Sequence, residues 1–541
     1  MRRALALALA ALGTLGFVLS GCDSDDAVSL GPPPQRSTTS GSDTSAPLPS
    51  TRSFEVWFAR GERLAPELRT HAATPRVATA ALAALLAGPT RVERASGVTT
   101  AIPRGTRPLG ISIKGGVATV DLTSEYQSGG GSLSMQVRLG QVVYTLTQFP
   151  TVRAVRFQLD GRPVDVFSGE GIVLDHPVGR SDYADLSAFG PEVAGTWRSL
   201  PPAPITVDAM LTSVWTGREM LIYGVSGVAP DGNFLKAVNV AAAYSPATRR
   251  WRRLAPPRGR AQYLGNHDAV WTGKEMLVWG TRAFDPRTNR WRRLPAPPAG
   301  GGIVVWTGHE LIGWGGGCCG DASADGAAYD PATNRWRRLA HAPLAGRQDP
   351  TGAWTGRELI ILPGRDPDGK RLEGAAAYNP ATDSWRRIAS LPIPPAGANA
   401  IWDGREVLVT GGTRAQRAPS ERGFAYDPTT NRWRRLPAMD FARTGPAAVW
   451  SGKHLLVWGG GAEVAGSDAP AIPPHGLVYD PRRNRWSPLP QAPLLGRVGP
   501  TAVWTGHELI VWGGETTECR ARRPCHTRRF ADGAAFTPGS A

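Results

Sequence analysis

The C-terminal two thirds of the chain alternate short apolar runs with turn residues. In each unit an apolar run ends at a tryptophan, a Thr-Gly or similar pair follows, and a second apolar run ends near glycine. The unit continues through Tyr-Asp, a Pro-x-Thr-Asn turn and Trp-Arg-Arg-Leu, as at Tyr329–Leu339. Short apolar runs bounded by turn residues predict β-strands, here four to each unit. The leading tryptophans mark seven units: Trp215, Trp271, Trp306, Trp354, Trp402, Trp450 and Trp504.

The period of these units predicts a β-propeller over residues 195–541. A spacing of 48 residues separates Trp306 from Trp354, Trp354 from Trp402 and Trp402 from Trp450, and four-stranded units repeated in this way form propeller blades. Residues 195–200 read as a fourth strand without a blade, and residues 533–536 as a third strand without a fourth. We expect the two ends to pair and close a ring of seven blades, because closure removes exposed sheet edges.

Residues 53–168 follow a different pattern, in which strands and helices alternate. A strand at 54–58 is followed by a helix, a hairpin, a second helix and a second hairpin. The order β-α-β-β-α-β-β predicts an α+β domain. Residues 169–194 would link it to the propeller. The expected caps and turns are Thr74-Pro75 and Gly88-Pro89 for the first helix, Ser132 or Ser134 for the second, and Gly115-Gly116 and Asp160-Gly161 for the hairpins.

The N-terminus has the features of a bacterial lipoprotein signal over residues 1–22. Arg2 and Arg3 precede an apolar stretch at 5–18 that is too short for a settled transmembrane helix, and Leu19-Ser20-Gly21-Cys22 resembles a lipobox. That resemblance implies cleavage before Cys22 and acylation of its thiol, with palmitate as a typical chain. The protein would then be held on the extracytoplasmic face of the cell membrane. Residues 23–52, rich in Ser, Thr, Pro and Gly, would form a disordered tether. The alternative is a plain secretory signal.

The paired phrases of the C-terminal region resemble the Kelch repeat. A di-glycine follows the second strand in several units, for example at Gly459-Gly460, and Tyr-Asp and a tryptophan follow at regular spacing. The segments at 280–281 and 362–364 depart from the di-glycine. The resemblance implies an all-β, Kelch-like propeller of seven blades.

The N-terminal domain resembles the GerMN family of sporulation and spore-germination proteins. The matching stretches are 85–90 (LLAGPT), 101–106 (AIPRGT), 117–122 (VATVDL) and 143–149 (VYTLTQF). The resemblance implies an envelope protein that assembles with another protein. The order of signal, GerMN domain and propeller also resembles the LpqB lipoproteins of actinobacteria, which would imply a sensor kinase nearby.

Charge narrows the class of partner. The chain carries 61 Lys and Arg against 45 Asp and Glu, a formal net charge of +16, which favours acidic partners such as anionic polymers or lipid. No nucleic-acid-binding motif is visible, so we expect no nucleic acid partner. No catalytic motif of the hydrolase, zinc-protease or nucleotide-binding kind is visible either. We therefore expect no cofactor and no enzymatic activity; the alternative is an exported glycan-acting enzyme with its site at the propeller channel mouth.

The cysteines predict two disulfides rather than a metal site. With Cys22 acylated, four cysteines remain, an even number in an oxidising compartment. Cys519 and Cys525 bound the short stretch ECRARRPC and are expected to pair. The adjacent Cys318 and Cys319 are expected to form a vicinal disulfide.

Two sets of arginines are candidates for binding an acidic ligand. The first consists of the Arg-Arg pairs of the outer strands, which would form a belt around the rim; the alternative is that they only protect exposed edges. The second consists of Arg347, Arg443 and Arg497, each seven residues before a leading tryptophan. The Kelch resemblance places such arginines at the channel mouth, where Arg522 and Arg523 of the last loop would join them. The alternative for these three is a structural role capping loop carbonyls.

Together these features predict an extracytoplasmic, membrane-anchored binding or scaffold protein of the cell envelope. Its GerMN-like domain would contact an envelope protein partner. Its propeller would bind an acidic protein segment or an acidic cell-wall polymer. The ligand and the partner are not named by the sequence.

Overall fold

The computed structural model describes residues 51–72, 74–95, 97–169, 171–228, 236–259, 269–280, 282–317, 321–391, 398–412, 423–461, 472–473, 475–520 and 523–539. The lipobox cysteine Cys22 and the predicted tether therefore lie outside the described residues, as do Cys318, Cys319 and Arg522. Within the described part of the chain, no helix has the length and apolar character needed to cross a membrane. The molecule is multidomain and mostly β, with few helices.

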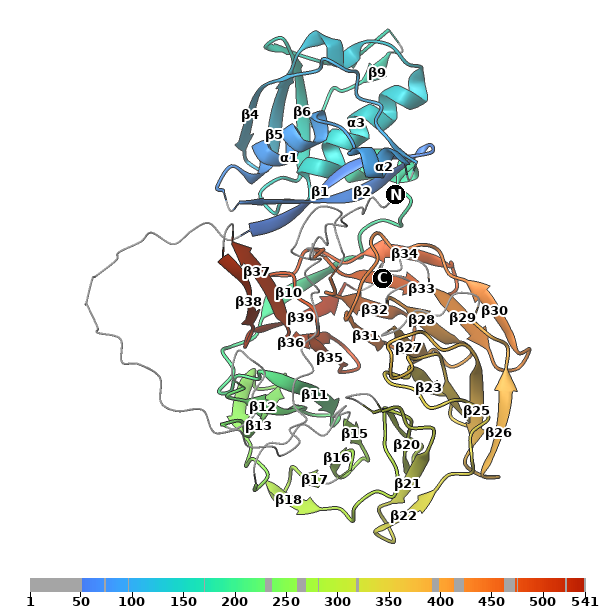
Figure 1. Cartoon of the computed structure of the whole chain (residues 1–541). Helices are drawn as coiled ribbons and strands as arrows, with labels where there is room; N and C mark the ends of the chain where they lie inside the picture. Colours follow the sequence, from blue (N-terminus) through green and yellow to red (C-terminus); the bar gives the residue numbers. More distant parts are fainter. Residues whose placement is uncertain are drawn as a thin grey trace, which may run out of the picture.

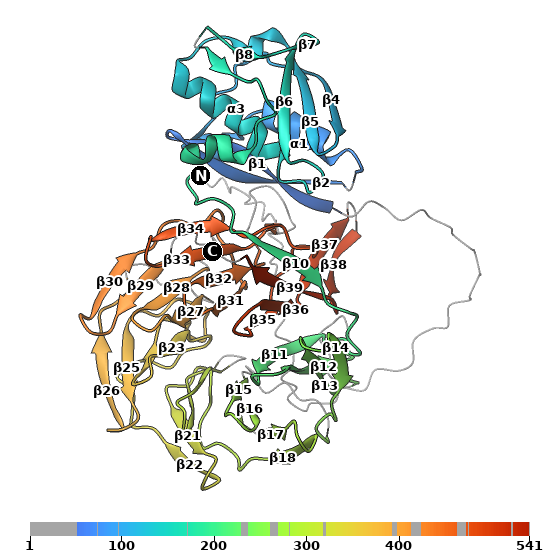
Figure 2. The same ribbon diagram turned by 180° about the vertical axis from the view of Figure 1, so that it is seen from behind.

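The N-terminal domain is α+β and lies at the top of the molecule in Figures 1 and 2. A hairpin of β1 and β2 pairs with β3, and a second sheet has the order β4-β5-β6-β7. In that sheet β5 and β6 run parallel, with α3 as the crossover between them. The elements are β1 (Thr51–Arg60), β2 (Arg63–Ala72), α1 (Val77–Leu86), α2 (Arg91–Ala95), β3 (Val98–Thr99), β4 (Pro108–Lys114), β5 (Val117–Leu122), a 3-10 turn (Ser124–Gln127), α3 (Ser132–Leu146), β6 (Ala154–Leu159), β7 (Arg162–Pro163), β8 (Val166–Phe167), β9 (Ile172–Val173) and a 3-10 segment (Arg180–Leu186).

Both predicted hairpin turns in this domain are confirmed, but the helix caps and one strand differ. The turns at Gly115-Gly116 and Asp160-Gly161 have positive φ at both residues, as a two-residue hairpin of this kind requires. The first helix begins at Val77 rather than at Pro75, and the Thr74 hydroxyl accepts a hydrogen bond from Arg76 N in the turn before the helix. The second helix is preceded by Gly131 and has no side-chain cap. Strand β2 was not predicted, because Pro66 and three charged residues interrupt its apolar pattern.

The C-terminal region contains seven four-stranded sheets, which continue from one to the next along the chain (Figure 1). In six of them the four strands are consecutive and antiparallel. They are β11 (Ala209–Trp215), β12 (Met220–Ser226), β13 (Val238–Ser245), β14 (Arg250–Arg253); β15 (Ala269–Trp271), β16 (Met276–Val278), β17 (Arg282–Asp285), β18 (Arg290–Arg293); β19 (Ile303–Trp306), β20 (Leu311–Trp314), β21 (Gly326–Asp330), β22 (Arg335–Arg338); β23 (Gly352–Trp354), β24 (Leu359–Ile361), β25 (Ala375–Asn379), β26 (Ser384–Ile388); β27 (Asn399–Trp402), β28 (Val407–Thr410), β29 (Phe424–Asp427), β30 (Arg432–Arg435); β31 (Ala447–Trp450), β32 (Leu455–Trp458), β33 (Leu477–Asp480) and β34 (Arg485–Pro488).

The remaining sheet joins the two ends of this region. Its order is β10-β39-β36-β35, where β10 is Gly195–Ser199, β35 is Thr501–Trp504, β36 is Leu509–Trp512 and β39 is Gly533–Pro538. The expected pairing of the entering and leaving strands is therefore observed, with Trp197 opposite Phe536. A separate hairpin, β37 (Glu515–Arg520) and β38 (Arg523–Arg529), projects from the same sheet. Figure 2 shows β10 running from the N-terminal domain to lie beside β39.

The first strands of neighbouring sheets contact one another in an unbroken cycle. Strand β11 contacts β15 and β35, and the contacts continue through β19, β23, β27 and β31 back to β35. The middle strands of each sheet are buried, for example all of β20, β28 and β36. Each sheet packs its apolar side chains against those of its neighbour. Because the first strands contact one another in a cycle, they lie at the centre of the region. The fourth strands, such as β18, β22, β26 and β30, therefore lie on its outside (Figure 1).

Candidate functional site

The recurring tryptophan of the fourth strand links each sheet to the preceding one. In all seven cases its indole nitrogen donates a hydrogen bond to a carbonyl just beyond the fourth strand of the neighbouring sheet. The pairs are Trp197–Pro490, Trp251–Pro201, Trp291–Ala255, Trp336–Pro295, Trp385–Ala340, Trp433–Ala389 and Trp486–Pro437. The repeated sequence motif therefore forms the turn and fourth strand of each sheet and also provides a contact to the neighbouring sheet.

The first arginine of each Arg-Arg pair is held inside the same network. Arg337, for instance, donates two hydrogen bonds to the Glu310 carboxylate at 2.7 and 3.0 Å, and a third to the Tyr378 hydroxyl of the next sheet at 3.0 Å. The Tyr378 hydroxyl in turn donates to Asp383 in the following turn. Bidentate arginine–carboxylate pairs of this kind recur in six sheets: Arg198–Glu508, Arg252–Glu219, Arg292–Glu275, Arg337–Glu310, Arg386–Glu358 and Arg434–Glu406. The recurring glutamates are thus structural.

The second arginine of each pair, and the arginine before the tryptophan, remain exposed to solvent. Fourth strands of the sequence Arg-Trp-Arg-Arg expose their first and last residues and half-bury the two between. We call the exposed set the rim arginines. They are Arg250, Arg253, Arg290, Arg293, Arg335, Arg338, Arg387, Arg432 and Arg435.

The arginines predicted at the channel mouth are buried and braced against the backbone. Arg347, Arg443 and Arg497 are 1%, 0% and 0% exposed. Each donates to carbonyls of adjacent loops, as Arg347 does to Gly374 at 3.0 Å and Arg443 to Gly459 at 3.0 Å. Burial lowers the pKa of Arg347 to about 10. Groups in this setting cannot reach a ligand in solvent, so the geometry favours the carbonyl-capping alternative over a binding role for these three residues.

The arginines and cysteines predicted to act in the last loop lie partly outside the described residues. Arg522 lies outside the described residues, and Arg523 begins β38 with its side chain outside them. The side chains of Cys519 and Cys525 are likewise not described, although both residues lie in the β37–β38 hairpin. Its register sets Glu518 opposite His526 and Arg520 opposite Arg523, with an irregularity between the two pairs, where Cys519 and Cys525 lie. Their disulfide stays a prediction.

The N-terminal domain packs against the sheet β31–β34, which departs from the repeat at two places. His454 stands where the other sheets have glutamate, and Ser487 stands where they have the bridging arginine. The segment after the N-terminal domain runs along β34: Gly190 N donates to the Trp486 carbonyl at 2.7 Å and Val193 N to the Pro488 carbonyl at 2.9 Å. A Cβ atom at Gly190 would overlap the Ser487 hydroxyl. A small residue at both positions therefore lets the segment lie flat on this sheet.

A buried cluster of charges joins the two domains beside this contact. His475 of the loop before β33 lies 2.8 Å from Glu55 of β1 through Nδ1 and 2.9 Å from Asp440 through Nε2. Asp440 also accepts from Arg443 at 2.7 Å, and Glu55 accepts from the Trp57 indole at 3.0 Å. The side chains of Glu55, Asp440 and His475 are 1%, 2% and 12% exposed. Burial lowers the pKa of His475, but the two carboxylates outweigh it and raise that pKa to about 9.

Positive and negative charges in the cluster balance, and its side chains are largely buried. With His475 protonated, two cations (His475 and Arg443) face two carboxylates (Glu55 and Asp440). Burial of Asp440 raises its pKa, but the guanidinium of Arg443 and the His475 ring lower it more, so the net shift is downward. Apolar side chains of both domains form one continuous core around the cluster. Of these groups the sequence analysis singled out Arg443 alone, as a candidate for ligand binding, and it did not point to Glu55, Asp440 or His475.

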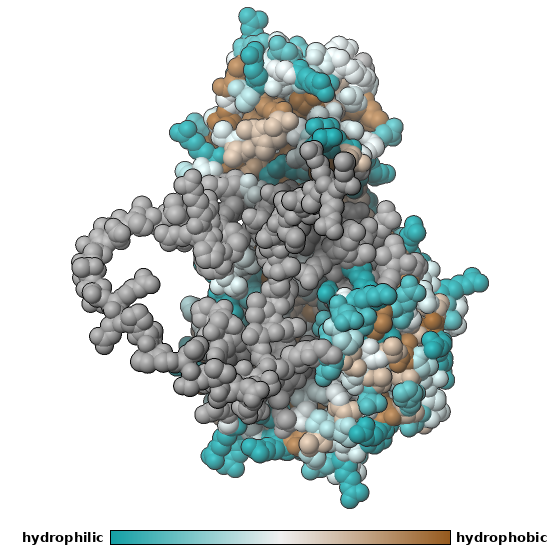
Figure 3. Space-filling view, in the orientation of Figure 1, coloured by the Kyte–Doolittle hydropathy of each residue, from teal (hydrophilic) through white to brown (hydrophobic). Residues whose placement is uncertain are grey.

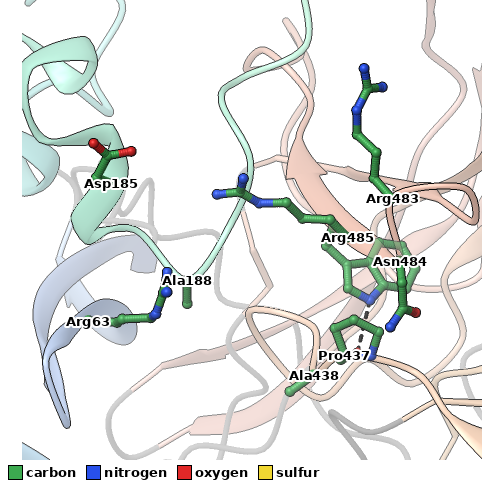
Figure 4. Close-up of a pocket in the computed structure, with 9 residues that line it drawn as sticks. Arg63, Asp185, Ala188, Pro437, Ala438, Arg483, Asn484 and Arg485 are labelled. Carbon is green, nitrogen blue, oxygen red and sulfur yellow. Dashed lines mark hydrogen bonds between the residues drawn. The ribbon is translucent and has the colours of Figure 1, made fainter.

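A cleft of about 530 Å³ opens at the edge of the same interface (Figure 4). Arg63 and Asp185 line it from the N-terminal domain, and Arg483, Asn484 and Arg485 from the sheet β31–β34. Arg63 and Arg485 donate to the Ser187 and Phe189 carbonyls of the connecting segment. Two of the three arginines thus hold the connection in place.

Metal-ligating side chains do not gather in the part of the chain that the structure describes. Over those residues, no group of three or more His, Cys, Asp or Glu side chains is placed to hold an ion. His309 and His507 occupy exposed turn positions in separate sheets.

Comparison with known proteins identifies both domains. Residues 55–165 match the Germane family model, described as sporulation and spore germination, and residues 283–521 match the attractin/LZTR1 β-propeller model. The chain therefore contains a GerMN-type domain followed by a β-propeller domain, as predicted. No curated protein sequence matches the chain.

Two solved structures are similar to this chain at low sequence identity. One is a fungal alcohol oxidase of the AA5 family in complex with copper, 13% identical, with a TM-score of 0.49, covering 64% of this chain and 76% of the oxidase. The other is YjhT, 15% identical, with a TM-score of 0.38, covering 61% of this chain and 95% of that one. Our prediction that the chain is not an enzyme is contradicted by this similarity to an oxidase. At this similarity it assigns no activity to the chain.

Proposed function

We propose that this protein is a lipid-anchored, extracytoplasmic protein of the cell envelope whose propeller binds an acidic polymer through the rim arginines. The GerMN-type domain would contact an envelope protein partner. The lipobox at Leu19–Cys22 supports the anchor. The observation that carries the acidic ligand is the row of exposed arginines on five fourth strands, in a chain with a net charge of +16.

The proposal includes a ring of seven blades. Seven four-stranded sheets, a cycle of contacts between their first strands, and seven indole–carbonyl hydrogen bonds between neighbouring sheets support it. In such a ring the fourth strands face outward, so the rim arginines follow the circumference. A flat bilayer touches a circumference along one side only, whereas a flexible polymer can follow it. We therefore favour a polymer with repeated phosphate or carboxylate groups, which guanidinium groups bind well.

The surroundings of the two sets of arginines also favour the rim, rather than the channel mouth, as the binding site. The mouth arginines that the sequence singled out are committed to backbone carbonyls and to Asp440 or Asp532. Of the rim arginines, Arg338 has a carboxylate nearby, at 3.8 Å from the exposed Asp325. Exposed pairs at this distance are weak and give way to a competing anion.

A charge-matched set of variants tests the proposal. The rim variant changes five exposed arginines to Gln: Arg253, Arg293, Arg338, Arg387 and Arg435. The control removes five exposed cations from the turns between first and second strands: Arg218, Lys274, Arg357, Arg405 and Lys453. Binding of polyphosphate and of poly-glutamate to the chain from residue 23 onward is measured across a salt series, beside anionic phospholipid vesicles.

The expected result is a loss of polymer affinity of at least tenfold in the rim variant, with a shallower salt dependence, and a much smaller loss in the control. Equal losses in both variants would show that only net charge matters and would refute the rim as a site. Binding to vesicles but not to either polymer would refute the polymer and indicate a membrane surface instead.

A further inference from the structure

Strand β4 of the GerMN-type domain is an open sheet edge. It pairs with β5 on one side, from Pro108 opposite Leu122 to Lys114 opposite Val117. In the part of the chain that the structure describes, no strand pairs with its other side. Six of its seven residues are exposed, and only Ile111 is half-buried. Figures 1 and 2 both place β4 at the lateral edge of the upper domain.

The edge lacks the protection that exposed edges usually carry. Natural edge strands are blocked by charges, prolines or bulges along their length. Here Pro108 and a bulge lie at one end and Lys114 at the other, but residues 109–113 are Leu-Gly-Ile-Ser-Ile, with no charge among them. Backbone groups along five residues are therefore open to another strand.

An apolar shelf borders this edge. Ile111 and Ile113 lie opposite Val120 and Ala118, both fully buried, so the two isoleucines belong to the core face of the sheet. Helix α1 contacts β4 and covers Ile111, but Ile113 is 43% exposed and Leu109 is 53% exposed. At Ile113 the core face of the sheet is therefore partly open to solvent, and Leu109 adds exposed apolar surface at the bulge. Figure 3 shows apolar surface on this domain.

Helix α1 leaves room for side chains above the shelf. Its sequence is VATAALAALL, and three of its partly or fully exposed positions are the small residues Ala80, Ala83 and Ala84. An added strand would place alternate side chains on the core face, between α1 and the exposed isoleucine, because successive residues of a strand point to opposite faces. Apolar residues at those positions would bury Ile113.

The charges at the two ends of β4 indicate which occupant fits. Arg107 and Lys114 are exposed at opposite ends of the strand, and Arg104 lies just before it. A second copy of β4 in antiparallel pairing would set Lys114 beside the partner copy's Pro108 and Arg107, placing like charges together at both ends, which is unfavourable. A segment with acidic residues at its ends would instead pair with them.

We propose that β4 is a docking edge at which an extended segment of a partner protein, apolar at alternate positions and acidic at its ends, adds as a further strand of the sheet. This inference rests on the partner role proposed above for the GerMN-type domain and names the mode and chemistry of that contact. Main-chain hydrogen bonds to β4 provide the pairing, and the shelf of Ile111 and Ile113 selects the side chains.

Synthetic peptides and two matched variants test the docking edge. The probes are labelled peptides of alternating valine and threonine with glutamates at both ends, the same composition in scrambled order, and the alternating core with lysine ends. Binding to the chain from residue 23 onward is followed by fluorescence anisotropy. Amide hydrogen exchange follows protection of β4.

The variants are Ile113→Lys at the edge and, as a control, Val166→Lys on β8, another apolar residue of the same domain that is 56% exposed. Both add one positive charge, which on electrostatic grounds alone would strengthen binding of an acidic peptide. We expect the acid-ended alternating peptide to bind the unmodified protein and the control and to protect β4. We expect Ile113→Lys to weaken that binding at least tenfold, with unchanged thermal stability.

Several outcomes would overturn the docking edge. They are absence of binding by the alternating peptide, equal binding to the Ile113→Lys variant, or protection of a segment other than β4. Concentration-dependent dimerisation that Ile113→Lys abolishes would overturn the partner segment in favour of a second copy. Polymer binding is measured on the same proteins, so that the two proposals are tested separately. If a protein binds the peptide but the rim does not bind polymer, only the polymer proposal is refuted.

Discussion

The buried ion cluster between the two domains predicts that their association depends on pH and on one histidine. The perturbation is His475→Gln, which removes the cation between Glu55 and Asp440. Arg443 still neutralises Asp440 in this variant, but Glu55 is left as a buried charge whose remaining side-chain partner is the neutral Trp57 indole. Removing one partner of a buried pair in this way costs about 3–5 kcal/mol.

The pKa of the histidine sets the pH range of the effect. A rise from 6.5 in the unfolded chain to about 9 in the folded protein corresponds to about 3 kcal/mol of stability, at about 1.4 kcal/mol per unit. Because the folded-state pKa is the higher one, this contribution is complete below pH 6.5. It declines as the pH rises toward 9 and is lost above it. Asp440 works in the opposite direction, because its lowered pKa contributes stability that is lost only in acid.

Calorimetry between pH 6 and pH 10 measures the effect on the chain from residue 23 onward, which retains every described residue. We expect the unmodified protein to lose about 3 kcal/mol across that range and its two domains to separate into distinct transitions at high pH. His475→Gln should show distinct transitions already at pH 6 and little further change. The double variant Glu55→Gln, His475→Gln should recover part of the loss, because no unpaired charge remains.

His176→Gln is the matched control, because this histidine pairs with Asp175 at the solvent-exposed surface. It should leave the calorimetric profile unchanged. The reasoning is refuted if His475→Gln is as stable as the unmodified protein, or if it retains the same decline between pH 6 and pH 10.

Two further predictions concern packed residues, Gly190 and Arg347, and a third concerns the cysteines of the last hairpin. Gly190→Ala should loosen the contact of the connecting segment with β34 by about 1–3 kcal/mol, because the added methyl group has no room there; calorimetry checks this against Gly169→Ala, where an added Cβ meets nothing. Arg347→Lys should lower the melting temperature although no ligand is lost, since an ammonium group cannot reproduce bonds to carbonyls on several loops. Cys519 and Cys525 should resist alkylation until reductant is added, as peptide mass spectrometry would show, and alkylation without reductant would refute their disulfide.

Much of the fold could be predicted from the sequence because its signals are local and repeated. Turn residues at Gly115-Gly116 and Asp160-Gly161 give hairpins through their own backbone preferences, which need no distant partner. The repeat is read in the same way, since each unit has its own apolar runs and turns. Strand β2 escaped prediction because Pro66 and its charged residues break the apolar pattern, and only pairing with β1 makes it a strand.

The site residues were harder to predict, because an arginine's role depends on what folds against it. Arg337 and Arg338 are adjacent and identical in type, yet one bridges Glu310 and Tyr378 while the other is exposed. The sequence showed that an arginine pair recurs, but not which arginine of the pair forms hydrogen bonds within the protein. From the sequence, Arg347 was likewise expected to be exposed for ligand binding, but in the folded protein the neighbouring loops bury it.

By itself, the sequence determined the order of the domains, the repeating four-strand unit and the basic character of the surface, because each follows from local pattern or composition. Only the tertiary structure decided how the domains meet. His475, Glu55 and Asp440 come from distant parts of the chain, and none belongs to a motif. Burial of such charges is favourable only when opposite charges converge from separate elements, and that convergence is a property of the packed molecule rather than of any segment.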